Sequence, residues 1–102
     1  MTADAAQDLE DIYDYVAVHD TPSKANYVLE RIERVVESHS AFPERGSFPK
    51  QLLSLGIREY RQTFFSPYRV IYRILDKRVY VYLIVDGRRD MQTVLVKRLF
   101  NA

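Results

Sequence analysis

The spacing of the apolar residues changes once along this chain of 102 residues, and that change limits the folds open to it. Before Pro43, apolar residues recur every three or four positions, which is the period of an amphipathic helix. After Gly56, they alternate with polar residues or form β-branched and aromatic runs, as in strands. Helices followed by strands predict an α+β fold, and the length predicts a single domain over residues 1–102.

The first third of the chain is expected to form two helices. Apolar positions within residues 5–16 share one helical face, and this helix should end near His19. Thr21 and Pro22 then give a start signal, because threonine caps a helix and proline suits its first turn. The second helix should stop before Pro43. The short link between the two predicts an antiparallel helical hairpin.

The rest of the chain is expected to form a three- to four-stranded antiparallel sheet and a short C-terminal helix. Residues 43–56 contain several prolines and glycines, which indicates a packed loop. The strands should lie at residues 57–65, 68–75 and 78–85, and the helix at residues 91–100. Val70 and Tyr72 face the side that should pack on the hairpin. Arg69 and Arg73 face the other side, which is expected to display arginines to solvent.

The charged residues are distributed unevenly. Residues 1–55 carry five basic and ten acidic side chains (−5), residues 56–102 carry ten basic and four acidic (+6), and the halves add to the formal charge of +1. Eight of the ten basic residues in the second half are arginines, whose planar guanidinium suits phosphates and carboxylates. The candidate surface for an anionic partner combines arginines and tyrosines of this half: Arg58, Arg61, Arg69, Arg73, Arg88, Arg89, Tyr60, Tyr68, Tyr72, Tyr80 and Tyr82.

Two interpretations of these arginines and tyrosines remain open. They bind an anion, either a nucleic-acid backbone or an acidic protein segment, or they only keep the sheet soluble and fill half-buried positions. Composition alone favours the second interpretation, because charge asymmetry indicates association but no partner. Arg88 and Arg89 follow a predicted strand and favour the first, since loops commonly carry functional groups. Asp86 and Asp90 are close enough in sequence to pair with them.

Several other kinds of site are excluded or disfavoured, so no cofactor and no metal are expected. The chain has no cysteine, and His19 and His39 lack companions at metal-site spacing. No glycine-rich phosphate loop or serine hydrolase motif occurs. The acidic residues of the first helix match no calcium loop and are expected to form a solvated face: Asp8, Glu10, Asp11 and Asp14. No membrane-spanning run or secretory signal is present, so a cytoplasmic location without a membrane partner is expected.

Four sequence motifs follow one another along the chain. They are DLEDIYDYV at residues 8–16, AFPERG at 41–46, SPYRVIYRI at 66–74 and VYLIVDGRRD at 81–90. In this order they resemble the ParE/RelE toxin superfamily, and its ParE-like, plasmid-stabilisation branch most closely. Members of the superfamily usually begin with a strand before the first helix, whereas this sequence begins at the helix.

The resemblance implies the toxin of a type II toxin–antitoxin system, neutralised by a ParD- or RelB-like antitoxin. The +6 half predicts that the antitoxin is an acidic segment that folds on binding. ParE-like members of the superfamily poison DNA gyrase, and RelE-like members cleave mRNA on the ribosome. RelE-like members use two lysines, two arginines and a tyrosine for this cleavage. The two arginine positions correspond to Arg69 and Arg89, and Arg88 is next to Arg89. The two lysine positions fall on Tyr60 and Gln62, and the tyrosine position falls on Leu95.

This comparison of positions favours a binding toxin that inhibits gyrase, because an arginine stays protonated and is a poor general base. The predicted target-binding residues are Arg69, Arg88, Arg89, Arg73 and Arg61. The alternative is a ribosome-dependent mRNA endoribonuclease, for which Arg69, Arg89 and Tyr60 are the catalytic candidates. A third possibility is a degenerate member of the superfamily that serves only as a binding partner.

Overall fold

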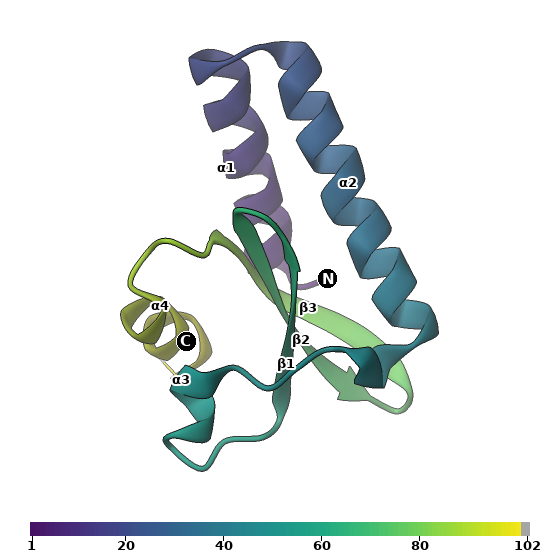
Figure 1. Ribbon diagram of the computed structural model, residues 1–102, viewed down its shortest axis with the longest axis vertical. Helices are drawn as coiled ribbons and strands as arrows, with labels where there is room; N and C mark the ends of the chain where they lie inside the picture. The colour runs from purple at the N-terminus through teal and green to yellow at the C-terminus, as the bar shows by residue number, and fades with distance from the viewer. Residues whose placement is uncertain (101–102) are drawn as a thin grey trace.

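The computed structural model describes residues 1–100 and consists of a helical hairpin, a three-stranded sheet and two further helices (Figure 1). The elements are α1 (Ala3–His19), α2 (Pro22–Ala41), the 3-10 helix η1 (Pro43–Arg45), α3 (Lys50–Leu53), β1 (Tyr60–Phe65), β2 (Tyr68–Leu75), β3 (Arg78–Asp86) and α4 (Met91–Phe100). The strands are antiparallel, in the order β1-β2-β3. The predicted α+β fold, with a helical hairpin on an antiparallel sheet and a short C-terminal helix, is confirmed.

The two long helices begin at threonine caps. The Thr2 hydroxyl accepts a hydrogen bond from the Ala5 amide at 3.1 Å, and the Thr21 hydroxyl accepts one from the Lys24 amide at 3.0 Å. Each bond satisfies an amide that has no partner within the helix. Pro22 occupies the first turn of α2, as the sequence predicts.

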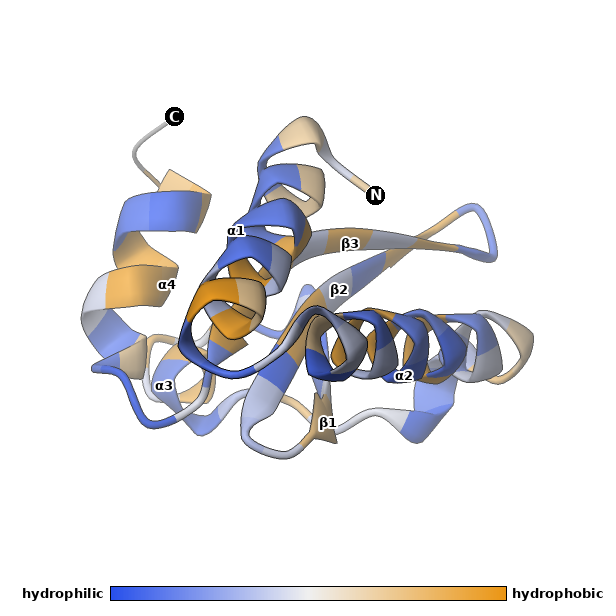
Figure 2. Cartoon of the chain, turned by 90° about the horizontal axis from the view of Figure 1, so that it is seen from above, coloured by the Kyte–Doolittle hydropathy of each residue, from blue (hydrophilic) through white to orange (hydrophobic). Residues whose placement is uncertain are grey.

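The hairpin covers one face of the sheet, which we call the hairpin face. Its buried residues are Ala5 and Leu9 of α1, Val28 and Ile32 of α2, and Val70, Tyr72, Val81 and Ile84 of the strands. The helices are amphipathic, with polar residues on their outer sides (Figure 2). The predicted packing of Val70 and Tyr72 against the hairpin is confirmed.

The opposite face of the sheet, which we call the α4 face, differs from the prediction of an open, arginine-bearing surface. Leu52 of α3 and Met91 and Leu95 of α4 pack on Ile71, Leu83 and Val85. Arg69 on this face is only 9% exposed, and Arg73 is half-buried. The prediction was wrong because apolar residues alternate with the arginines here, and they are stable only when other elements cover them.

Local details of the sheet also differ from the sequence prediction. β1 begins at Tyr60 and not at Ile57, whose amide bonds to the Leu52 carbonyl at 2.9 Å and closes α3. The turn between β2 and β3 is the predicted Asp76-Lys77 pair, and both residues have positive φ, 49° and 65°. Such a turn matches the twist of a two-residue hairpin.

Candidate functional site

Tyr72 links the sheet to the loop that contains the AFPERG motif. Its hydroxyl donates to the Pro43 carbonyl at 2.6 Å and accepts from the Gly46 amide at 3.1 Å. A Cβ at Gly46 would collide with this hydroxyl, so the close approach requires glycine. Tyr72 is 1% exposed. The proposal that Tyr72 belongs to an exposed anion-binding surface is therefore wrong, and its role is to hold the loop.

Arg61 holds the same loop from β1. Its Nη1 donates to the Gly46 carbonyl at 2.9 Å and to the Glu44 carbonyl at 3.2 Å, and its guanidinium lies 4.5 Å from the centre of the Phe48 ring. The Arg61 guanidinium thus satisfies two backbone carbonyls of the loop. Arg61 thus makes structural contacts with the loop, although the sequence placed it among the target-binding residues.

Arg69 is a buried cation under the loop that follows β3. Its Nη2 donates to the Gln62 side-chain oxygen, its guanidinium lies 5.5 Å from the Phe64 ring centre, and its Nε has no partner among the described residues. A Cβ at Gly87 would lie 2.8 Å from the Arg69 side-chain carbons, so Gly87 lets the loop cross directly over it. Burial lowers the pKa of Arg69. The structure therefore places Arg69 within the fold and not on a contact surface.

Two of the three endoribonuclease candidates, Tyr60 and Arg69, lie apart on the sheet. Tyr60 pairs with Arg73 and Phe64 pairs with Arg69, so Tyr60 and Arg69 are four residues apart along the sheet, roughly 13 Å at 3.3 Å per residue. The Arg73 guanidinium lies 5.9 Å from the Tyr60 ring centre. Burial raises the pKa of Tyr60, which keeps its hydroxyl protonated. A protonated tyrosine cannot serve as a general base.

The loop after β3 carries the predicted pair Arg88 and Arg89, and both are exposed. The Arg88 Nε donates to Asp86 Oδ1 at 2.9 Å, and this bond lowers the pKa of the Asp86 carboxyl. Asp90 instead caps α4, because its carboxylate accepts from the Thr93 amide at 3.3 Å, and it also accepts from the Thr93 hydroxyl at 2.9 Å. No ion pair of Arg89 occurs among the described residues, which leaves its guanidinium available to a partner.

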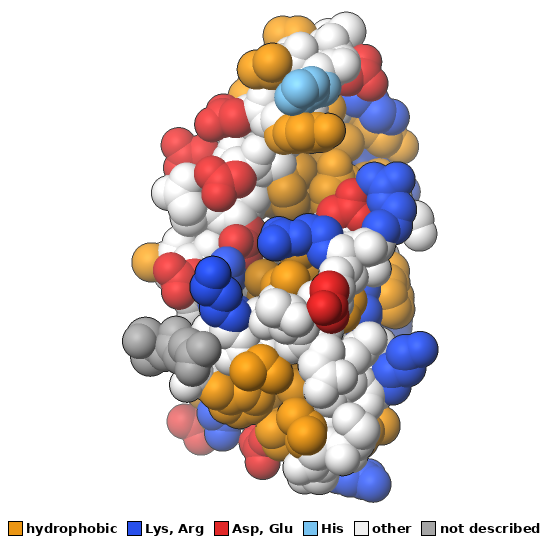
Figure 3. All heavy atoms as spheres, turned by 90° about the vertical axis from the view of Figure 1, so that its left-hand side faces the viewer, with side chains coloured by type: hydrophobic (Ala, Val, Ile, Leu, Met, Phe, Trp, Pro, Cys, Tyr) orange, Lys and Arg blue, Asp and Glu red, His pale blue; other side chains and the backbone are white. Residues whose placement is uncertain are grey.

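Arg88 and Arg89 line a groove between α1 and the end of the sheet, which we call the α1 groove. Its central hollow has a volume of about 480 Å³, with Ile12 and Ile84 among its apolar residues and Tyr15 and Tyr68 along it. Tyr15 and Tyr68 also line the next hollow, of about 320 Å³, toward the tip of the hairpin. Figure 3 shows apolar side chains on this face of the molecule with both basic and acidic residues beside them.

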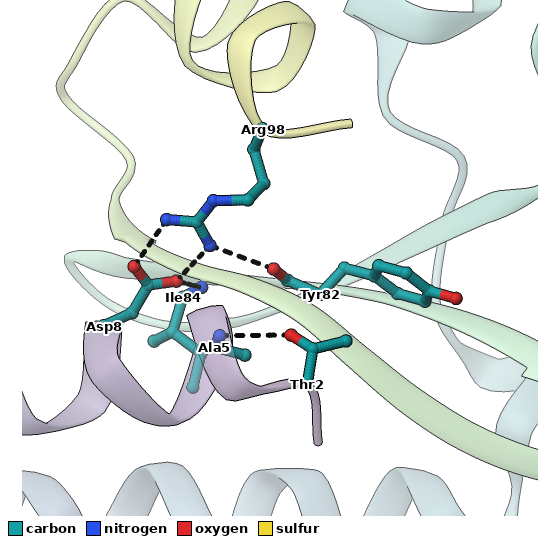
Figure 4. Close-up of polar contacts among 6 residues, drawn as sticks. All are labelled: Thr2, Ala5, Asp8, Tyr82, Ile84 and Arg98. Carbon is teal, nitrogen blue, oxygen red and sulfur yellow. Dashed lines mark hydrogen bonds and ion pairs between the residues drawn. The ribbon is translucent and has the colours of Figure 1, made fainter. Parts of the chain in front are cut away.

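Asp8 and Arg98 form a contact that the sequence analysis missed. The two guanidinium nitrogens of Arg98 reach the two carboxylate oxygens of Asp8 at 2.7 Å each, and Asp8 also accepts from the Ile84 amide at 3.0 Å (Figure 4). Arg98 donates further to the Tyr82 carbonyl at 3.0 Å. This pair, here called the Asp8–Arg98 fork, joins α1, the outer edge of β3 and α4.

The prediction that Asp8 lies on a solvated acidic face is wrong. Its side chain is 13% exposed and that of Arg98 is 24% exposed. The available signal was the helical position of Asp8. It falls on the same side of the helix as residues 5 and 12, and the other residues on that side are apolar. An acidic residue in an apolar stripe indicates a partner across the core.

Comparison with known proteins gives a family and a fold. The family model described as the ParE toxin of the type II toxin–antitoxin system parDE matches residues 1–91. The chain belongs to the ParE toxin family. A solved structure described as the chromosomal ParDE toxin–antitoxin system from P. aeruginosa matches the fold with a TM-score of 0.68 and 23% sequence identity. That match covers 83% of this chain and 89% of the other. Comparison with curated proteins gives no match.

Membership of the ParE family confirms the resemblance drawn from the four motifs and gives this chain a toxin role with a cognate antitoxin. Within residues 1–100, no helix combines the length and the apolar content needed to cross a membrane. The structure divides the predicted target-binding residues of this ParE-family chain into two groups. Arg61 and Arg69 make internal contacts, whereas Arg88 and Arg89 line the α1 groove and Arg73 lies half-buried beside Tyr60.

Proposed function

We propose that this ParE-family toxin acts in the cytoplasm by binding DNA gyrase and that it is not an enzyme. The observation that carries this proposal is the separation of the catalytic candidates. Arg69 is buried and bonded to Gln62, and Tyr60 lies roughly 13 Å from it along the sheet with a raised pKa. Cleavage of RNA by its own 2′-hydroxyl needs a positioned base, and neither a protonated tyrosine nor an arginine can accept the proton.

The α1 groove supports the proposal that an acidic antitoxin segment neutralises the toxin. The apolar residues of the groove suit the apolar side of a folding segment. Asp8, Asp11 and Asp86 also line the groove. Arg88 pairs with Asp86, so Arg89 is the cation that suits the carboxylates of such a segment. Gyrase is proposed to contact Arg88, Arg89 and Arg73. Occupation of the α1 groove by the antitoxin would then block the target, which accounts for neutralisation by simple occlusion.

A gyrase assay tests this function. Purified toxin in excess should stabilise gyrase–DNA cleavage complexes, measured as linear plasmid after denaturation, and Arg89→Ala should reduce that yield. The matched control is Arg34→Ala, which removes an exposed arginine of α2 that pairs within its own helix with Glu30. Unimpaired supercoiling at excess wild-type toxin would contradict gyrase inhibition. Codon-positioned cuts in translated mRNA, lost in Arg89→Ala, would establish the endoribonuclease instead.

Salt dependence tests the antitoxin proposal separately. If Arg89 attracts an acidic segment, the dissociation constant of the toxin–antitoxin complex should rise with ionic strength, because salt screens exposed charges. Arg89→Gln should make that rise less steep, whereas Arg34→Gln should leave it unchanged. A dissociation constant independent of salt would show that the antitoxin binds through apolar contacts alone.

A further inference from the structure

The loop around the AFPERG motif presents an exposed aromatic side chain on a fixed backbone. Phe42 is 61% exposed, yet the carbonyl and amide groups beside it are bonded to residues of the sheet. Tyr72 binds Pro43 and Gly46, and Arg61 binds the carbonyls of Glu44 and Gly46. A buried tyrosine and a half-buried arginine thus hold a loop whose own apolar residue points away from the core.

Phe42 makes a cation–π contact with Arg45. The Arg45 guanidinium lies 4.8 Å from the Phe42 ring centre, and its Nη1 donates to the Ser38 hydroxyl at 3.2 Å. Both side chains are therefore restrained before any partner arrives. Phenylalanine and arginine on a rigid backbone lose little conformational entropy on binding, and arginines and aromatic residues are frequent among the residues that dominate binding energy.

A hollow of about 690 Å³ lies beside this pair, between the end of α2 and the hairpin of β2 and β3. Pro43 and Ile74 give it apolar walls, and Arg45 and Lys77 lie along it. Glu44 also lines it, and no ion pair of Arg45 or Lys77 occurs among the described residues. The hollow therefore suits an apolar side chain that has a carboxylate next to it.

Phe42, Arg45 and the hollow beside them together form what we call the Phe42–Arg45 surface. We propose that this surface is a second contact for the target of the toxin. A folded protein would place an apolar side chain in the hollow and a carboxylate against Arg45 and Lys77. This inference rests on the proposed function only for the identity of that protein as gyrase. The surface lies at the end of α2, on the opposite side of the molecule from the loop before α4 in Figure 1.

A folded target fits this surface better than the antitoxin does. The hollows along α1 adjoin one another at Tyr15 and run from Asp8 to His19, which suits a segment that folds as it binds. The Phe42–Arg45 surface is short and fixed by internal hydrogen bonds, which suits contact between two preformed surfaces. Antitoxin and target would then compete at the α1 groove but not at Phe42.

The test compares Phe42→Ala with Tyr27→Ala. Tyr27 is a matched control, because it is an aromatic residue of α2 that is 49% exposed and has the Lys24 ammonium 5.0 Å from its ring centre. Phe42→Ala should weaken binding to immobilised gyrase at least about tenfold and abolish growth arrest on induced expression. Tyr27→Ala should change neither, and the affinity of both variants for the antitoxin should equal that of the wild type.

Three results would overturn the inference. Unchanged growth arrest by Phe42→Ala would show that the surface does not contact the target. An equal loss of antitoxin affinity would assign the surface to the antitoxin, and a wild-type dimer that Phe42→Ala converts to a monomer would assign it to a second copy. If wild-type toxin does not bind gyrase but Phe42→Ala still loses growth arrest, the proposed gyrase target fails while the docking surface stands.

A positioning variant adds a second line of evidence for the fixed loop. Tyr72→Phe keeps the buried ring and removes the hydroxyl that binds Pro43 and Gly46. It should weaken gyrase binding less than Phe42→Ala does, although Tyr72 is buried and touches no partner. Wild-type binding by a folded Tyr72→Phe protein would show that preorganisation of the loop contributes nothing.

Discussion

The two faces of the sheet are covered in different ways. The hairpin face packs against α1 and α2, of 17 and 20 residues, whereas the α4 face is covered by α3 and α4, of 4 and 10 residues. The shorter cover is supplemented by a polar contact, because the Asp8–Arg98 fork joins α4 to α1 and β3. A region with fewer apolar contacts opens more easily, so the α4 face should be where the molecule loosens first.

The largest expected effects come from one core substitution on each face. Ile32 and Leu95 are both fully buried, and replacing either by alanine should cost about 2–5 kcal/mol of unfolding free energy. Ile32→Ala should lower amide protection throughout the molecule, because Ile32 lies in the core between the hairpin and the sheet. Leu95→Ala should expose α4 amides first. Hydrogen exchange measured by mass spectrometry distinguishes the two patterns, and a uniform loss in Leu95→Ala would contradict the difference between the faces.

An intermediate effect is expected from breaking the Asp8–Arg98 fork. Asp8→Asn leaves the Arg98 guanidinium largely buried without its carboxylate, which should cost about 2–4 kcal/mol in unfolding free energy. Asp11→Asn, on the exposed side of α1, is the control and should cost less than about 0.5 kcal/mol. The comparison is made by urea unfolding. Adding Arg98→Met to Asp8→Asn should restore part of the loss, since no buried charge then remains unpaired.

The sequence was sufficient for elements with a strong local pattern. The caps at Thr21 and Pro22, the helical spacing of α2 and the alternation in β2 all depend on residues close together in the chain. On the α4 face, the C-terminal helix was predicted at residues 91–100, but α3, the other part of the cover, was not. α3 spans only Lys50–Leu53, which is about one helical turn and too short to display a period.

The residues of the candidate site also differ in how far local sequence predicts their roles. Arg88 and Arg89 were predicted to lie on a loop after a strand, and the structure places them on that loop with both side chains exposed. The roles of Arg61 and Arg69 depend on contacts with Gly46 and with the Gln62 side chain, which sequence spacing does not indicate. The fork is the extreme case, since 90 positions separate Asp8 from Arg98. The helical position of Asp8 indicates that it has a partner, but the local pattern does not indicate which distant residue that partner is.

The smallest expected effect concerns the hydrogen bond between Arg88 and Asp86, which lies at the end of β3 just before α4. The hydrogen bond from Arg88 holds the pKa of Asp86 below its ordinary value, so the folded protein binds a proton there less readily than the unfolded chain does. The contribution to stability is therefore complete above the ordinary aspartate pKa, near ~3.9, and is lost as the pH falls through the lowered folded-state value.

Arg88→Gln should consequently flatten the fall in urea midpoint between neutral and strongly acidic pH. The change should be slight, because the Arg88 side chain is 77% exposed and its charge is screened by water. Arg89→Gln is the control, since Arg89 makes no hydrogen bond to Asp86 and lowers its pKa only weakly, through its charge. An unchanged acid profile in Arg88→Gln would mean that the loop before α4 adds no polar support, and that the α4 face depends on its apolar contacts and the Asp8–Arg98 fork alone.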